Sequence, residues 1–252
     1  MTAAAVRSRT AAIPSPRPPA DDTPSARSTA SCRAVAYQRV LHQLVRRELR
    51  LLSELATWAP AAETDRTAAL TRHADLIGRV LLHHHAVERH AVWPALLRTA
   101  PEPRATEVGD AVADWTARCA QIDRMLRDVG TAARQWSVAA TTGARDAFAT
   151  ACRDLADAVD GQTRAEERSL LPLLDEYLEP ADWAAIARSS RCRLPAQEQL
   201  LVLGLALEDA CAADRARLLD GLPRATRIAW RLSGGRHYRA AVVRLRGEPP
   251  AP

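Results

Sequence analysis

One short pattern of residues occurs twice in this 252-residue chain, and its polar members could bind a metal ion. In the first copy His84 precedes Glu88 by four residues, so both side chains lie on the same face of a helix. An imidazole and a carboxylate with this spacing can ligate one cation in the core of a helical bundle. The second copy keeps its glutamate, Glu166, but has Gln162 in place of the histidine. We therefore expect a metal site built from two helices, one of which has lost a ligand.

The elements that must position these residues are long amphipathic helices. Apolar residues recur at three- and four-residue steps, which is the helical period. A proline follows the glutamate of each copy, and Pro94 is expected to kink the last turns of its helix. Short connections between the helices predict an all-α fold with an antiparallel up-down-up-down four-helix bundle. The four expected helices cover residues 35–58, 65–98, 106–136 and 144–177.

The chain changes character after Pro180, where the helical stretches become shorter. The last stretch is rich in arginine and is expected to be interrupted at Gly234 and Gly235. We interpret this part as a C-terminal helical extension packed on the bundle, with helices over residues 183–188, 198–211, 213–219 and 226–244. The expected organisation is a disordered N-terminal tail over residues 1–33, the bundle over 34–179, the extension over 180–246 and a disordered tail over 247–252.

The composition is that of a globular protein and limits the classes of function. Hydrophobic residues make up 47% of the chain, and all 35 basic residues are arginines. A net charge of +5 permits contact with a nucleic acid, but no helix-turn-helix or zinc-finger spacing supports it, so we expect no nucleic-acid partner. No apolar run reaches the ~18 residues of a membrane-spanning helix, so no membrane span is expected. Five cysteines without a CxxC pair indicate reduced thiols and a cytoplasmic location.

The string HHHAVERHAVWPALL, with His42 in the upstream LHQLVRREL, resembles the hemerythrin-like (HHE cation-binding) family over residues 35–177. Members of this family are four-helix bundles that typically hold a non-haem di-iron centre, with histidines from all four helices and two bridging carboxylates. The resemblance makes His42 and His84 ligands from the first and second helices, and Glu88 and Glu166 the bridging carboxylates. The chain beyond the bundle is similar to the extension that some bacterial members carry.

The chain departs from the family pattern at two histidine positions. Cys119 stands where the third helix of the family has a histidine, and Gln162 stands at the fourth-helix position. Asp123 lies four residues after Cys119 on the same helix face and could also ligate. Imidazole suits iron, whereas a neutral amide is a poor ligand for it. We therefore expect one iron ion held by His42, His84, Glu88 and Glu166 rather than two, with Cys119, Asp123 and Gln162 as weakened positions for a second ion.

The remaining histidines of the first copy are expected to have other roles. His83 and His85 point away from His84 on either side and are expected at the edge of the bundle or as supporting residues. His90 is expected to be exposed. His73 lies three turns from His84, roughly 16 Å along the helix, which is too far for the two to share an ion.

The function that the resemblance implies is binding of non-haem iron for sensing of small molecules or redox state, or for handling of dioxygen, nitric oxide or iron. No nucleophile–base pair or phosphate-binding loop occurs, so we do not expect an enzyme. The alternative is a metal-free structural or protein-interaction scaffold, in which Glu88 and Glu166 must be neutral, exposed or paired with arginines such as Arg47 or Arg168. A third and weaker interpretation is a thiol redox switch at Cys119.

Overall fold

The computed structural model describes residues 26–190 and 193–247, with side chains from Arg33 onward. These residues form helices joined by short connections, and no strand occurs among them. The expectation of an all-α fold is therefore confirmed. The tails expected at the two ends of the chain lie largely outside the described residues. None of the described helices has an apolar stretch long enough to cross a membrane.

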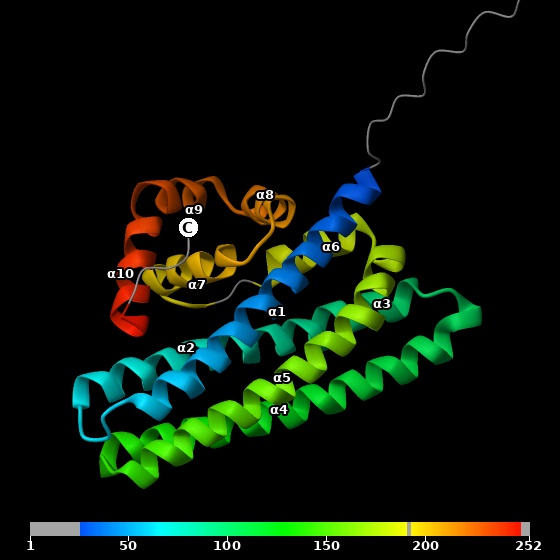
Figure 1. The fold of residues 1–252 in the computed structure, drawn as a ribbon. Helices are drawn as coiled ribbons and strands as arrows, with labels where there is room; N and C mark the ends of the chain where they lie inside the picture. The colour runs from blue at the N-terminus through cyan, green and yellow to red at the C-terminus, as the bar shows by residue number, and fades with distance from the viewer. Residues whose placement is uncertain (1–25, 191–192, 248–252) are drawn as a thin grey trace, which may run out of the picture.

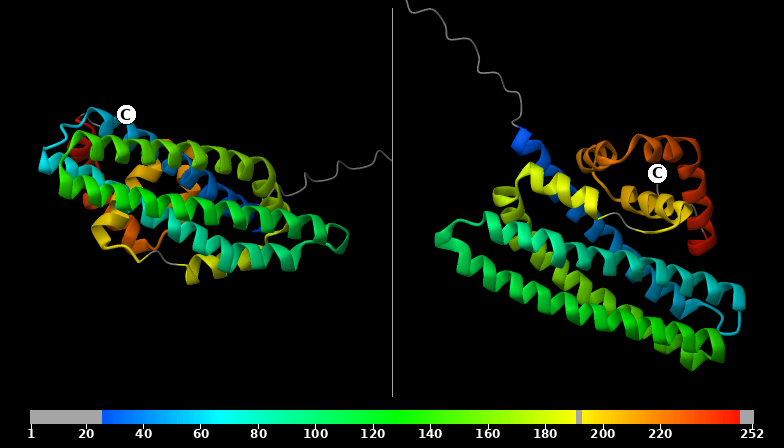
Figure 2. Two further views of the ribbon diagram at one scale, coloured as in Figure 1. Left: turned by 90° about the horizontal axis from the view of Figure 1, so that it is seen from below. Right: turned by 180° about the vertical axis from the view of Figure 1, so that it is seen from behind.

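Four long helices lie side by side and make up most of the molecule (Figures 1 and 2). Helix α1 contacts both α2 and α5, and helix α4 contacts the same two neighbours. Each long helix therefore has two long neighbours around a shared interior. The first of them begins earlier than the residue 35 expected from the sequence. Their bounds are α1 Ala26–Trp58, α2 Thr64–Val87, α4 Ala105–Ala139 and α5 Thr142–Tyr177.

The interior contains two clusters of buried apolar side chains. In the larger cluster Trp136 packs on Phe148, with the ring centroids 5.4 Å apart. In the smaller cluster Trp93 stacks on Trp115 at 5.5 Å. On α2, α4 and α5 the candidate ligands lie in sequence between residues of the two clusters. The polar groups are therefore separated from solvent along the helix axes by apolar side chains.

The helical backbone does not stop where α2 ends, at Val87, but continues through one wider turn. Residues Glu88–Val92 form a π-helical turn, which leads directly into α3 (Trp93–Thr99). Pro94 lies in the first turn of α3, where its missing N–H is tolerated best. In the second copy Pro172 lies inside α5. The sequence predicted a kink at Pro94, and the structure has a π turn immediately before it. The two copies of the sequence pattern therefore have different backbones.

The C-terminal extension consists of shorter helices, and the first three of them contact α1. Hydrogen bonding continues through Gly234 in a π turn, but α9 and α10 run in different directions on either side of it (Figure 1). A Cβ atom at Gly234 would lie 2.3 Å from Cε3 of Trp230, so only glycine fits there. The elements are α6 Pro180–Ser189, α7 Ala196–Glu208, α8 Ala212–Gly221, α9 Arg224–Ala229, the π turn Trp230–Gly234 and α10 Gly235–Arg246, and a short 3₁₀ helix Glu102–Arg104 precedes α4.

A buried ionic network ties this extension to the long helices. Glu48 on α1 is fully buried and accepts a hydrogen bond from Arg47 Nε at 2.7 Å and from Arg246 Nη2 at 2.8 Å. His73 Nε2 on α2 lies 2.7 Å from the other oxygen of Glu48. Arg246 also donates to Glu208 on α7, at 2.6 Å. The network therefore joins α1, α2, α7 and α10, and its members must be paired because each is costly to bury alone.

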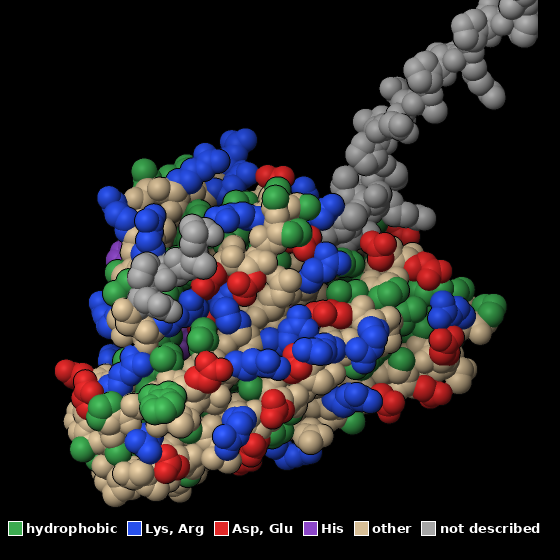
Figure 3. Space-filling model, viewed as in Figure 1, with side chains coloured by type: hydrophobic (Ala, Val, Ile, Leu, Met, Phe, Trp, Pro, Cys, Tyr) green, Lys and Arg blue, Asp and Glu red, His purple; other side chains and the backbone are tan. Residues whose placement is uncertain are grey.

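The outer surface carries charges of both signs. On the face shown in Figure 3, arginine side chains (blue) are interspersed with acidic ones (red) over the long helices. The positive net charge of +5 is therefore not gathered into one continuous patch on that face of the long helices.

The Glu48 network leads to a prediction about stability and pH. Despite its burial, His73 and the two arginines lower the pKa of Glu48 from 4.5 to about 2, which corresponds to about 3 kcal/mol of stability. Because the pKa is lower in the folded state, this contribution is present above pH ~4.5 and is lost as the pH falls towards 2. We expect Glu48→Gln to lower the free energy of unfolding by about 3 kcal/mol at pH 7, and the deficit to shrink below pH ~4.5. Urea unfolding at a series of pH values measures both quantities.

The control for this prediction is Glu107→Gln, which changes an exposed carboxylate paired with Arg104. Solvent screens that pair, so the substitution should have little effect at any pH. A deficit for Glu48→Gln that stayed constant down to pH ~2.5 would show that Glu48 does not act through its charge.

Candidate metal centre

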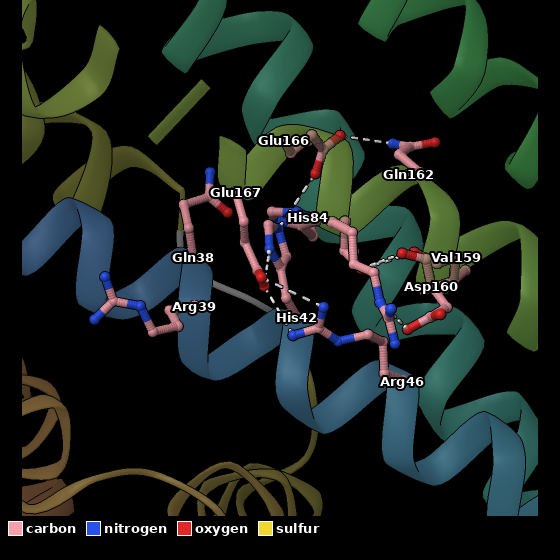
Figure 4. A network of polar contacts seen from close by, with 12 residues as sticks. Gln38, Arg39, His42, Arg46, His84, Val159, Asp160, Gln162, Glu166 and Glu167 are labelled. Atoms are coloured by element: carbon pink, nitrogen blue, oxygen red, sulfur yellow. Dashed lines mark hydrogen bonds and ion pairs between the residues drawn. The ribbon is translucent and has the colours of Figure 1, made fainter. Parts of the chain in front are cut away.

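Three potential ligands from three helices meet between the two apolar clusters. His42 from α1, His84 from α2 and Glu166 from α5 each offer one atom, and these atoms lie within 4.8 Å of one another. The Nε2 atom of His42 is 3.3 Å from Oε2 of Glu166. Figure 4 shows the three side chains pointing toward one another from their separate helices. We call His42, His84 and Glu166 the first group.

The hydrogen bonding of the first group fits a bound cation. His84 Nδ1 is buried without a hydrogen-bond partner, and the buried Nε2 of His42 faces Glu166 Oε2 at 3.3 Å without the geometry of a hydrogen bond. Buried nitrogens normally have a partner, because leaving one unpaired costs about 1–3 kcal/mol. Imidazole nitrogens together with a carboxylate are donors that iron and zinc accept. The residues present therefore suit a metal ion.

His42 is held in place by a carboxylate behind it. Its Nδ1 atom lies 3.3 Å from Oε1 of Glu167, which also accepts a hydrogen bond from Arg46 at 2.8 Å. A proton on Nδ1 shared with Glu167 leaves Nε2 free to ligate, which is how metal-binding histidines are usually oriented. Burial lowers the pKa of His42, but Glu166 and Glu167 outweigh it and raise the pKa above its usual value. Protons and a cation therefore compete for this ring.

Sequence analysis did not single out Glu167 or Arg46. The available signal was an arginine one helical turn after His42 and an acidic residue next to Glu166. Neither could be assigned, because the pairing depends on how α1 packs against α5.

A second set of potential ligands adjoins the first. His85, Glu88 and Cys119 are all buried, and each offers an atom within 4.8 Å of the other two. Glu88 lies between the two sets, since Oε1 is 3.3 Å from His84 Nε2 and Oε2 accepts from Cys119 Sγ at 3.8 Å. We call His85, Glu88 and Cys119 the second group.

His85 is a candidate ligand that sequence analysis placed at the edge of the bundle or in a supporting role. It is buried, and its position three residues before Glu88 puts the two side chains on neighbouring parts of one helix face. That spacing was the available signal.

Asp123 was expected as a weakened ligand and has a different position. Its carboxylate lies outside both groups, with Oδ1 2.6 Å from His85 Nδ1. Its other oxygen accepts a hydrogen bond from Arg89 at 3.0 Å. Asp123 therefore orients His85 in the way that Glu167 orients His42.

Gln162 was also expected as a weakened ligand, and it also lies outside both groups. Its Nε2 donates to Oε1 of Glu166 at 2.7 Å and to Sγ of Cys119 at 3.2 Å. The amide therefore links the carboxylate of the first group to the sulfur of the second. Cys119, the third weakened position, does lie within a group.

Burial dominates the electrostatics of the centre. It raises the pKa of Glu88 well above its usual value, and the neighbouring Glu166 raises it further. Burial also lowers the pKa of His84, with smaller contributions from His42 and His85. The protein without a cation therefore favours a protonated Glu88 and a neutral His84. A divalent cation would supply the positive charge that allows Glu88 to ionise.

Pairing with arginines, one of the three ways in which a metal-free scaffold could keep Glu88 and Glu166, is not observed among the described residues. Arg47, one of the arginines proposed for this role, binds Glu48 instead. In the absence of a cation, the buried carboxylates depend on protonation and on hydrogen bonds, such as that from Gln38 to Glu88 at 3.3 Å.

The environment of Cys119 does not resemble that of a reactive thiol. The side chain is fully buried, and burial raises its pKa, with further increases from Glu88 and Glu166. Reactive cysteines lie in accessible and electropositive surroundings that lower the pKa. The geometry therefore gives no support to a redox switch at this position.

The other histidines take no part in either group. His73 belongs to the Glu48 network, and His83 Nε2 contacts the backbone oxygen of Ser190 at 3.1 Å. His90 is exposed, as expected.

One comparison with known proteins bears on this centre. A family model described as "Hemerythrin HHE cation binding domain" matches residues 33–174. The matched region includes both groups and more than half of the chain. No curated protein and no solved structure matches the chain.

The raised pKa of Glu88 leads to a prediction for the metal-free protein. The folded state binds this proton more tightly than the unfolded state, so the wild type loses stability as the pH rises above the ordinary pKa of 4.5. We expect metal-free Glu88→Gln to be at least as stable as the wild type at pH 7. The advantage should grow by about 1.4 kcal/mol for each pH unit through which Glu88 stays protonated.

Urea unfolding of both proteins in the presence of a chelator, between pH 4.5 and 7.5, measures this advantage. Glu167→Gln is the matched control with the opposite sign, because its contacts with His42 and Arg46 lower the pKa of Glu167 despite burial. If Glu88→Gln is the less stable protein at pH 7, Glu88 is ionised and paired without a cation.

Proposed function

The chain belongs to the hemerythrin HHE cation-binding domain family, and on this basis we propose that it binds a non-haem iron ion through His42, His84 and Glu166. The observation that carries the proposal is the convergence of two imidazoles and one carboxylate in a buried space between three helices. Two histidines and one carboxylate form a donor set that suits iron(II) and leaves coordination positions open. Glu88, beside His84, is available as a further ligand.

The proposal includes the arrangement of the long helices as the antiparallel up-down-up-down bundle typical of that family. Its support is that short connections join α1 to α2, α3 to α4 and α4 to α5, that the π turn joins α2 to α3, and that each long helix contacts two others. Such bundles place inward-facing side chains of several helices around one cation.

The role we propose is binding, for small-molecule or redox sensing or for handling of dioxygen, nitric oxide or iron, rather than catalytic turnover. Bound iron would supply a coordination position for such a small ligand or a change of redox state. Residues around the ligands hold them in position: Glu167 contacts the ring of His42, and the amide of Gln162 donates a hydrogen bond to Glu166. Cys119, Cys152 and Cys211 are free thiols, which supports the proposal of a cytoplasmic location.

Iron binding is tested by elemental analysis of protein purified from iron-supplemented culture. We expect about one iron per chain in the wild type and loss of it in His84→Ala, because one imidazole ligand is removed. His83→Ala is the matched control, since this neighbouring histidine contacts Ser190 instead of the first group. Added iron(II) should raise the free energy of unfolding of the wild type by about 2.7 kcal/mol at a hundredfold excess over Kd.

Other outcomes would redirect the proposal. Protein without metal, and without a shift in stability on adding iron(II), would point to the metal-free scaffold. Equal iron in His84→Ala and the wild type would place the ion elsewhere.

A further inference from the structure

The second group offers a set of donors different from that of the first. It combines the imidazole of His85, the carboxylate of Glu88 and the sulfur of Cys119, and all three side chains are buried. A tetrahedral zinc ion with bonds of about 2.3 Å to sulfur and about 2.1 Å to oxygen would place those two atoms about 3.6 Å apart. The sulfur of Cys119 and Oε2 of Glu88 are 3.8 Å apart. The two atoms therefore already have nearly the spacing that one cation requires.

The surroundings of these three residues also fit a metal site. Asp123 lies 2.6 Å from His85 Nδ1 and is itself held by Arg89. This carboxylate fixes the imidazole so that Nε2 remains to ligate. Gln162 donates a hydrogen bond to the sulfur of Cys119 at 3.2 Å, and such a bond stabilises a thiolate. Asp123 and Gln162, which were expected as weakened ligands, thus support the ligands of the second group without belonging to it.

We propose that His85, Glu88 and Cys119 form a second cation site, which binds zinc in preference to iron. The preference follows from the thiolate, because soft sulfur ligands favour zinc whereas the first group offers only nitrogen and oxygen donors. Binding displaces the thiol proton that Cys119 donates to Glu88, together with the proton that Glu88 itself holds in the metal-free protein. Two protons therefore pass to solvent for each cation that the metal-free chain binds. The inference rests on the proposed function, since Glu88 serves both groups, and it makes the centre a mixed one with iron and zinc in neighbouring positions.

Cobalt(II) is the probe for this site, because it adopts zinc geometry and absorbs in the near ultraviolet when bound to thiolate. We expect titration of the metal-free full chain to produce this absorption, saturating at one thiolate-bound cobalt per chain. Zinc should abolish the absorption at a concentration at least tenfold lower than iron(II) requires. The absence of thiolate absorption in the wild type, or equal competition by iron(II), would overturn the proposal.

Matched variants assign the absorption to particular residues. Cys119→Ser should abolish it, whereas Cys152→Ser should retain it, because Cys152 is equally buried but lies in the larger apolar cluster. Retention in Cys119→Ser or loss in a folded Cys152→Ser would contradict the assignment. Asp123→Asn, which leaves all three ligands in place, should weaken cobalt binding 10- to 100-fold. Unchanged affinity in Asp123→Asn would contradict the role of the Asp123 carboxylate in orienting His85.

A variant of the first group separates this inference from the proposed function. His42→Gln should lose iron but retain the cobalt–thiolate absorption, because His42 is not in the second group. Thiolate absorption in a wild type that binds no iron would leave the zinc site standing and refute the iron site. Bound iron without thiolate absorption would support the iron site and refute the zinc site.

Discussion

The structure depends on keeping two carboxylates, Glu88 and Glu166, inside the protein between two apolar clusters. Their side chains are 0% and 1% exposed, and no arginine among the described residues neutralises them. Removing an ionised carboxylate from water is costly, so each must be protonated, hydrogen-bonded or bound to a cation. Hydrogen bonds meet part of this need: the side-chain amide of Gln162 donates to Glu166, and that of Gln38 donates to Glu88.

Another buried carboxylate, Glu48, is stabilised in a different way. It lies on α1 beyond the metal centre, and two arginines and a histidine surround it. Its pKa is lowered, whereas that of Glu88 is raised. Arg47 and Arg246, which are always charged, stabilise the ionised form of Glu48, and Arg246 also attaches the C-terminal extension to α1. No arginine is paired with Glu88 or Glu166 among the described residues, so a bound metal ion can supply the positive charge there. The contrast within one molecule distinguishes a structural carboxylate from a binding one.

Much of this arrangement could be predicted from the sequence, because helical period and the spacing of His84 and Glu88 are local properties. The family resemblance implied His42 and Glu166 as ligands from two other helices, and the structure brings them together. The role of Glu167 could not be predicted, since it depends on how α1 packs against α5. The role of His85 had a local signal in its spacing from Glu88, but its partner Cys119 lies on another helix. The pairing of Glu48 with Arg246 is still less accessible, because it joins residues far apart in the chain. Spacing placed Asp123 on the same helix face as Cys119 and suggested a ligand. In the structure Asp123 contacts His85 and lies outside both groups.

The π turn after His84 and His85 has a consequence for how α2 and α3 are aligned. The backbone N–H of Trp93 bonds to the oxygen of Glu88, five residues earlier, so this turn contains one residue more than a regular one. One residue corresponds to about 100° of rotation in an α-helix. The inserted residue therefore shifts the phase of the helix, and Trp93 follows Glu88 on the inward side instead of turning away from it. His84 and Glu88 on one side of the insertion and the Trp93–Trp115 stack on the other can both face the interior because the extra residue rotates the second part of the helix relative to the first.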